Sequence, residues 1–235
     1  MRLHDDNTLY KKPKHNHKCK YNFEKDFTII KQIDSGAYAN IYLAKSISTN
    51  TTYAIKCINK KQTRLTASNS ISTSINNEKR ILKSLQHPFI LKLHFAFQDD
   101  NYIYLATDYL QHNDLHYHIQ RNTCFTEDQT KFYLSEVYIA IKYLHSKGII
   151  HRDIKSENIM LTDTGHIILI DFGSAKKLFN DSHNNNNNVT TSSFIGTAEC
   201  MPPEVVERKS YSFELSKHCS KIILGQFGCL ENKFM

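Results

Sequence analysis

Two segments between Ile150 and Gly173 constrain this chain more than any other part of its sequence. The first, residues 151–158, reads His-Arg-Asp-Ile-Lys-Ser-Glu-Asn, and the second, residues 171–173, reads Asp-Phe-Gly. The apolar run 167–170 leads directly into the second segment and has the composition of a short buried strand. Each triplet could arise by chance alone, but this spacing and the strand-like run together predict a site for phosphoryl transfer.

The residue types in these segments fit that chemistry. Phosphoryl transfer requires an aligned hydroxyl, neutralised oxygen atoms and a dry site, and little covalent work from the protein. Asp153 is predicted to accept or orient the proton of the substrate hydroxyl, and Lys155 can reach the phosphate in transfer. Asn158 and Asp171 supply the hard oxygen ligands that Mg²⁺ prefers.

Such a site also needs a Lys on a strand and a Glu on a helix, because their ion pair positions the phosphates of ATP. Lys56 ends the β-compatible segment Tyr-Ala-Ile-Lys, and Glu78 lies in the helical pattern 75–85. Alone, either residue would be a solvated surface charge. The apolar residues expected to share one face of that helix are Ile75, Ile81, Leu82 and Leu85.

The segment 33–41 occupies the place of a glycine-rich loop that covers the phosphates. Such loops use three glycines so that backbone amides can approach the phosphates. This chain keeps only the middle one, Gly36, with Asp34 and Ala39 at the outer positions. The Asp34 carboxylate would lie near the phosphates and counts against tight nucleotide binding. Without Lys56 downstream, this segment would read as an ordinary β-turn.

These motifs resemble those of the serine/threonine protein kinases, and the position of Lys155 favours that class over tyrosine kinases. Further segments resemble the AGC group, namely 77–82, 87–89 and 95–100. Within that group, 97–100, 143–150 and 193–198 are most similar to the 3-phosphoinositide-dependent protein kinases. The resemblance runs from about Asp26 to about Lys209.

The resemblance implies a nucleotide site that takes ATP with Mg²⁺. Ala54 would pack against the adenine, and Thr107 would be the gatekeeper residue before the hinge. Asp114 matches the acidic residue that holds the ribose. The other residues implied at the nucleotide are Ile33, Gly36 and Ile41 near the covering loop, and Asp108 and Leu110 in the hinge.

The resemblance also implies regulation and protein partners. Ser193 matches the phosphorylation site of the activation segment, where a phosphate would pair with Arg152 and order the loop. On the residues alone, Ser193 would be a solvated loop serine. The implied protein substrates include the activation loops of other AGC kinases, docked through a groove beside the helix of Glu78. Lys79 and Gln98 match positions in that groove.

The order of patterns predicts an α+β fold with two lobes. Strand patterns dominate a β-rich N-lobe at 24–108, and helical patterns follow in an α-rich, partial C-lobe at 109–209, with an Asn-rich insert at 184–188. The clearest helix opens at Thr126, where Thr126 and Gln129 form a capping-box pattern, and stops at Gly148. Its expected buried face comprises Phe132, Val137, Ala140, Ile141 and Leu144.

The net charge is +7, and much of the excess lies in the tail 1–23. This tail is expected to be disordered, although weak contact with an acidic membrane stays open. The sequence contains no motif that would read a nucleic-acid groove, and no segment is apolar enough to span a bilayer. The six cysteines lack the paired spacing of a metal site and favour a reduced, cytoplasmic protein. His116 and His118 could be metal ligands, but the sequence favours two exposed helix residues.

The resemblance deteriorates after residues 201–204. Protein kinases continue into an apolar helix that opens with Asp and Trp, and this chain contains no Trp. If 227–230 match the residues after that pair, then Ile223 and Gly225 stand in their places. Glu204 would then lack its Arg partner, the C-lobe would be incomplete, and 210–235 would be a divergent segment.

Three interpretations therefore stay open. The chain is an active Ser/Thr kinase or a fragment of one, or a catalytically inactive homologue that binds nucleotide or a partner, or the reading frame contains an error near Ser210. The intact set of Lys56, Glu78, Asp153, Asn158 and Asp171 favours catalysis.

Overall fold

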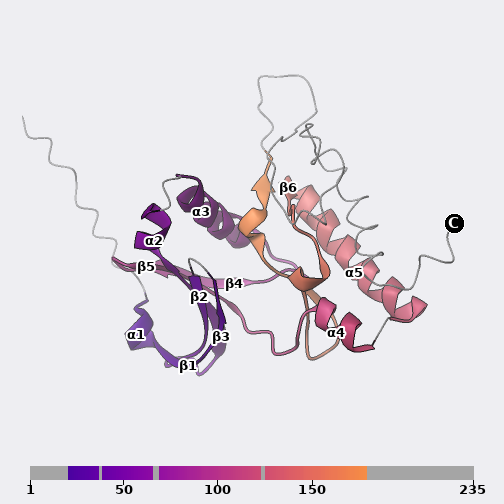
Figure 1. Ribbon diagram of the computed structural model, residues 1–235, viewed down its shortest axis with the longest axis horizontal. Coiled ribbons are helices and arrows are strands. Elements are labelled where there is room, and N and C mark those ends of the chain that lie inside the picture. Colours follow the sequence, from indigo (N-terminus) through magenta and orange to yellow (C-terminus); the bar gives the residue numbers. More distant parts are fainter. Residues whose placement is uncertain (1–20, 37–38, 66–68, 123–124, 179–235) are drawn as a thin grey trace, which may run out of the picture.

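The structure is a computed structural model that describes residues 21–36, 39–65, 69–122 and 125–178 (Figure 1). These residues form a sheet-rich first half and a second half built from helices and short strand pairs (Figure 1). The predicted α+β arrangement in two lobes is confirmed. Within the described residues, no helix is both long and apolar enough to cross a membrane.

The N-lobe is an antiparallel five-stranded sheet in the order β1-β2-β3-β5-β4. β2 and β3 are paired residue by residue from Ala39 with Ile58 to Lys45 with Thr52. The strands are β1 (Phe27–Ser35), β2 (Ala39–Ser46), β3 (Thr52–Asn59), β4 (Leu93–Gln98) and β5 (Tyr102–Asp108).

Alternation along the strands gives this sheet two different faces, because successive side chains of a strand point to opposite sides. One face carries an aromatic core in which Phe27 stacks on Phe97 at a centroid distance of 5.8 Å, and Phe97 stacks on Tyr104 at 4.8 Å. On β3, Tyr53, Ile55 and Cys57 belong to this core. Lys56 and Ile58 therefore point to the other face, where Ile58 packs with Ile75 and Leu105.

Three helices accompany the sheet, and the longest of them carries Glu78. These are α1 (Phe23–Asp26), α2 (Lys60–Leu65) and α3 (Asn69–Ser84). The predicted apolar face of the Glu78 helix is confirmed, since Ile75, Ile81 and Leu82 are buried, as is Leu85 one residue beyond its end.

The C-lobe is built around α5, whose predicted start is confirmed by a complete capping box between Thr126 and Gln129. Four of the five residues expected on its buried face are buried, but Phe132 is 44% exposed, so that assignment was wrong. Glu136 is buried instead and accepts hydrogen bonds from the side chain of His166 and the amide of Ile167. The C-lobe elements are α4 (Leu115–Asn122), α5 (Glu127–Ser146), β6 (Ile149–Ile150), η1 (Ser156–Asn158), β7 (Ile159–Leu161), β8 (Ile167–Leu169), η2 (Phe172–Ser174) and β9 (Lys176–Lys177).

A continuous apolar core joins the two halves. Leu82 and Leu85, from and just after α3, pack into the same cluster as Leu144 of α5 and Leu169 of β8. Phe172 of the Asp-Phe-Gly segment is fully buried in this cluster. The segments that carry Asp153 and Asp171 therefore pack, through Ile154 and Phe172, on a core shared by the C-lobe and α3.

Candidate active site

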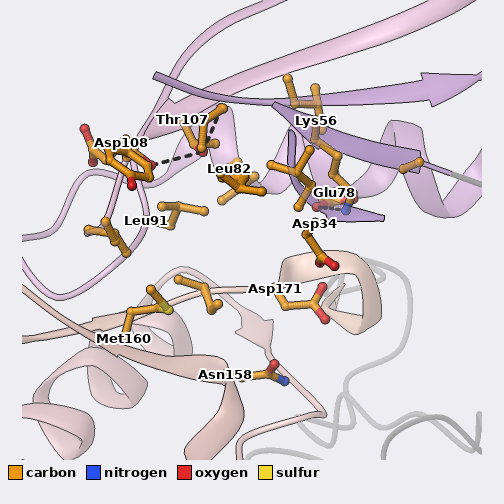
Figure 2. A pocket seen from close by; sticks show the side chains of 18 of the residues that line it. Asp34, Lys56, Glu78, Leu82, Leu91, Thr107, Asp108, Asn158, Met160 and Asp171 are labelled. Carbon is orange, nitrogen blue, oxygen red and sulfur yellow. Dashed lines mark hydrogen bonds and ion pairs between the residues drawn. The ribbon is translucent and has the colours of Figure 1, made fainter. Parts of the chain in front are cut away.

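A cavity of about 480 Å³ lies between the sheet and the loops of the C-lobe (Figure 2). Most of the sequence-predicted site residues line it together, although they come from distant parts of the chain. Those in its wall are Ile33, Gly36, Ile41, Ala54, Lys56, Glu78, Asp108, Leu110, Asn158 and Asp171, and Asp34 and the expected gatekeeper Thr107 are there as well.

Several apolar residues of the cavity wall were missed by sequence reasoning. Leu105 shares a face of β5 with Thr107, so strand alternation could have identified it. The others reach the cavity through tertiary packing, and the local patterns that placed Leu82 on an apolar helix face and Ile170 in a buried run did not indicate contact with a cavity. These other residues are Leu82, Leu91, Met160 and Ile170.

Asp114, expected at the ribose, does not line this cavity. Its Oδ1 accepts the amide of Tyr117 at 2.8 Å, so the carboxylate stabilises the first turn of α4. On the same helix, His116 and His118 are half-buried rather than exposed, which corrects that expectation. His116 binds Ser156 and Gln120, and Nε2 of His118 is buried without a hydrogen-bond partner among the described residues.

The hinge side of the cavity is polar at Asp108 and Thr107. Nε2 of His94 lies 2.6 Å from Oδ1 of Asp108, which holds the carboxylate in place. The Thr107 hydroxyl donates to the carbonyl of Ala54 at 3.3 Å, which links the gatekeeper position to the expected adenine contact.

Lys56 and Glu78 form the predicted ion pair across the upper wall (Figure 2), with Nζ 2.9 Å and 3.1 Å from the two carboxylate oxygens. Burial alone would lower the pKa of Lys56, but the charge and hydrogen bond of Glu78 and the charge of Asp171 raise it above its ordinary value. Lys56 is therefore a fixed positive charge at the place where phosphates would enter the cavity.

Asp153, Lys155 and Asn158 form a polar group on the C-lobe side, of which Asn158 lines the cavity and the predicted catalytic residues Asp153 and Lys155 do not. The side-chain Nδ2 of Asn158 donates to the carboxylate of Asp153 at 2.9 Å and to the backbone carbonyl of Asp153 at 2.8 Å. Lys155 Nζ lies 3.5 Å from the same carboxylate. Because the nitrogen of Asn158 is used in this way, its amide oxygen is the atom that it offers to the cavity.

His151 and Arg152 attach the segment 151–158 to the backbone around Asp171. Nε2 of His151 lies 2.9 Å from the carbonyl of Ile170, and Nε of Arg152 donates to the carbonyl of Ser174 at 2.7 Å. His151 is buried, and burial lowers its pKa, so the ring is neutral and donates through Nε2 while Nδ1 accepts the amide of Asp153.

The backbone is strained where these two segments meet. Arg152 and Asp171 adopt left-handed conformations with φ of 71° and 56°, which non-glycine residues rarely do. Oδ1 of Asp171 accepts the amide of Gly173 at 3.2 Å, and a Cβ at Gly173 would lie only 3.2 Å from that oxygen. Such strain is concentrated at functional sites. Here it keeps the Asp171 carboxylate in the cavity wall (Figure 2).

The donors fit a hard divalent cation. No cluster of three or more His, Cys, Asp or Glu side chains in the described ranges could hold a metal ion. Mg²⁺ in phosphate sites needs only one or two protein ligands, because water and the phosphates complete its octahedron. Asn158 and Asp171 line one cavity and supply one amide oxygen and one carboxylate, so they would suffice.

Comparison with known proteins agrees with this geometry. The family model described as the protein kinase domain matches residues 27–227. This chain belongs to the protein kinase family. The match includes every element that forms the cavity wall, and it continues past Lys209, where the resemblance by motif ended.

The similar curated proteins include serine/threonine-protein kinase Sgk1 from Rattus norvegicus, Bos taurus and Homo sapiens. Each is 38% identical to this chain over 199 residues, which are 85% of this chain and 44% of the relative. The chain thus spans less than half the length of the curated relatives it matches. These relatives support the predicted AGC type, while the finer likeness to 3-phosphoinositide-dependent kinases stays a prediction.

Other predictions fall outside the described residues. These concern Ser193 and its pairing with Arg152, residues 1–20 of the basic tail, the Asn-rich insert 184–188, Glu204 and the C-terminal segment after Lys209. Residues 21–23 of the tail are described, and the expectation of disorder is wrong there, because Tyr21 packs on Phe95 and Phe23 stacks on Tyr104 in the N-lobe core. Lys79 and Gln98 are described, at half-buried and exposed positions on α3 and β4.

Proposed function

We propose that this chain transfers the γ-phosphate of ATP to Ser or Thr hydroxyls of proteins, with Mg²⁺ as cofactor. One observation carries the proposal. The Lys56–Glu78 ion pair and the Asp153–Asn158 pair come from opposite lobes, and Lys56, Glu78, Asn158 and Asp171 line a single cavity.

Each side chain then has a step to perform. Ala54, Thr107 and the hinge residues bind and orient the base, and Lys56 binds the phosphates while Glu78 fixes its direction. Asp153 accepts the proton of the attacking hydroxyl, and Lys155 lies beside it to stabilise the transferring phosphate. When bound at Asn158 and Asp171, Mg²⁺ would neutralise charge on the phosphates.

The apolar wall contributes by excluding water. Leu91, Leu105 and Met160 line the same cavity as the polar groups, and apolar walls that keep water out of a site strengthen each electrostatic contact within it. This arrangement favours transfer to a protein hydroxyl over loss of the phosphate to water.

The finer predictions remain proposals of the same function. The substrates would include activation loops of AGC kinases, docked beside α3 near Lys79 and Gln98, and phosphorylation of Ser193 would engage Arg152. A cytoplasmic location and weak contact of the basic tail with acidic membranes are also proposed, and nucleic acid is not expected as a partner.

A second candidate function is a catalytically inactive module that binds nucleotide or a protein partner. Asp34 favours it, because this carboxylate lines the cavity and would repel phosphates (Figure 2). The five catalytic and binding groups are nevertheless in place, so phosphoryl transfer is the function that the geometry supports best.

The test measures transfer of labelled γ-phosphate from MgATP to Ser, Thr and Tyr peptides by the purified chain. We expect phosphate on Ser and Thr peptides, and a loss of turnover of about 10²–10⁴-fold in Asp153→Asn, which removes the proton acceptor. Undiminished turnover in this variant would exclude the proposed role of Asp153. Nucleotide binding without any turnover by the wild-type chain would instead support the inactive module.

A further inference from the structure

Asn77 makes a contact that neither the motifs nor the proposed chemistry requires. Its side-chain Nδ2 donates to the backbone carbonyl of Ala175 at 2.7 Å, 98 positions later in the chain. Asn77 is half-buried on α3, and Ala175 is completely buried just after the Asp-Phe-Gly segment. A polar bond in such a place is worth more than one at the surface, because water cannot replace it easily.

The neighbouring carbonyl is held from the other side. Arg152, in the segment that carries Asp153, donates through Nε to the carbonyl of Ser174 at 2.7 Å. Two successive carbonyls are therefore bound by side chains from opposite lobes. The segment that follows Asp171 runs beside α3, as its orange ribbon shows in Figure 1. Asn77 and Arg152 thus form a clamp on the backbone at Ser174 and Ala175.

The position of Asn77 gives this clamp a consequence for the ion pair. Asn77 directly precedes Glu78, whose carboxylate binds Lys56. Since consecutive residues of a helix move as one rigid unit, a shift of α3 that breaks the Asn77 bond also moves Glu78 away from Lys56. Packing alone does not explain an Asn here, because Asn is a poor helix former and an apolar residue would fill the same space.

We propose that Asn77 is a positioning residue that couples the Lys56–Glu78 ion pair to the backbone behind Asp171. The proposal rests on the proposed kinase function. Through this bond, the phosphate-binding charge of Lys56 in the N-lobe keeps a fixed position relative to the metal-binding carboxylate of Asp171 in the C-lobe.

The test uses Asn77→Ala with Asn76→Ala as the matched control. Asn76 is exposed on the same helix, so both changes gain the same helix propensity and only one removes the clamp. We expect kcat to fall roughly five- to tenfold in Asn77→Ala with little change in KM for ATP, and no loss in Asn76→Ala. In Asn77→Asp, whose side chain has nearly the same shape but no hydrogen to donate, kcat should fall at least as far.

Two further measurements separate a positioning role from a general loss of stability. Combining Asn77→Ala with Glu78→Gln should lower kcat by less than the product of the single effects, since both act through one ion pair. Hydrogen exchange should be faster at 172–177 in Asn77→Ala without nucleotide and unchanged in Asn76→Ala.

These readouts distinguish the two hypotheses. If exchange at 172–177 is faster in Asn77→Ala but the chain has no kinase activity, the clamp is supported and the proposed function is contradicted. Normal exchange at 172–177 with full kcat in Asn77→Ala would overturn the clamp and leave the proposed function standing. Additive effects in the double variant would also contradict coupling through Glu78.

Discussion

The wall of the cavity formed by β1–β5 is held mainly by backbone pairing between long strands, with register shifts only in β1 and β4, whereas the loops that carry Asp153 and Asp171 combine a few backbone hydrogen bonds with side chains that bind backbone carbonyls. Every residue of β2 from Ala39 to Lys45 has a paired residue on β3. On the other side, β6, β7, β8 and β9 have only two or three residues each. Their place is taken by side chains that bind backbone carbonyls, which are those of Asn77, His151, Arg152 and Asn158.

This difference has consequences for function. A backbone ladder tolerates side-chain changes, because the hydrogen bonds do not depend on residue type. A loop held by a side chain loses its support when that one residue changes. The sheet can therefore accept an unusual residue such as Asp34 in its phosphate-covering loop, while the opposite loops depend on a specific residue at each anchor.

Within the sheet wall, the largest effect is expected at Lys56. Lys56→Met should lower kcat about 10²-fold, because the positive charge and its bond to Glu78 are lost. The strand β3 should stay in place, because its backbone pairing does not depend on this side chain. The measurement is steady-state turnover together with the circular dichroism spectrum. Lys31→Met, the same change at an exposed position of β1, is the control and should keep full turnover. Equal losses in both variants would contradict the special role of Lys56.

Lowering the pH should destabilise the loops that carry Asp153 and Asp171 before it destabilises the sheet. Burial lowers the pKa of His151, His145 and His87, so in the folded state these groups bind protons less readily than in the unfolded chain. As the pH falls below the ordinary histidine value of about 6.5, the unfolded state takes up more protons and stability decreases. Above that pH the contribution is fully present.

The measurement for this prediction is the melting temperature between about pH 7.5 and 5.5. Each kcal/mol lost lowers it by roughly 2–4 °C in a chain of this size. His151→Asn, which cannot titrate in this range, should show a smaller fall than the wild type. Hydrogen exchange at about pH 5.5 should accelerate at 149–177 before it does in β2 and β3. Simultaneous loosening of both regions would remove the distinction between them.

The smallest effect is expected at Asp34 in the sheet wall. Asp34→Gly and Asp34→Asn should each raise the affinity for MgATP about two- to fivefold, because they remove a carboxylate from the cavity but its charge is exposed and screened. Calorimetric titration measures the affinity, with adenosine as a ligand that should bind unchanged. Asp100→Asn, at an exposed site outside the cavity, is the matched control. Weaker MgATP binding in Asp34→Gly would show that the carboxylate helps the nucleotide.

Sequence reasoning succeeded where a function needs particular side chains at fixed spacing. The capping box of α5 and the apolar face of α3 are local patterns, and the structure confirms both. The pairing of Lys56 with Glu78 was foreseen because phosphate chemistry demands both charges.

Contacts to backbone carbonyls could not be foreseen in the same way. The acceptors of Asn77 and Arg152 are carbonyls, which every residue has, so no residue type marks Ser174 or Ala175 as partners. Asp114 was misplaced relative to the cavity because an acidic residue before a helix can equally stabilise its first turn. Phe132 was misjudged because the period of the helix allows either Phe132 or Tyr133 to turn inward, and Tyr133 packs on the core.

The sheet and the loops together are expected to bind a nucleotide with its metal ion. Titration of ATP with and without Mg²⁺, in the wild type and in Asp171→Asn, tests it most directly. Asn accepts the left-handed backbone at this position and keeps one side-chain oxygen, so the variant removes mainly the charge. We expect Mg²⁺ to strengthen ATP binding about tenfold or more in the wild type and to have little effect in Asp171→Asn. An identical dependence on Mg²⁺ in both proteins would contradict it.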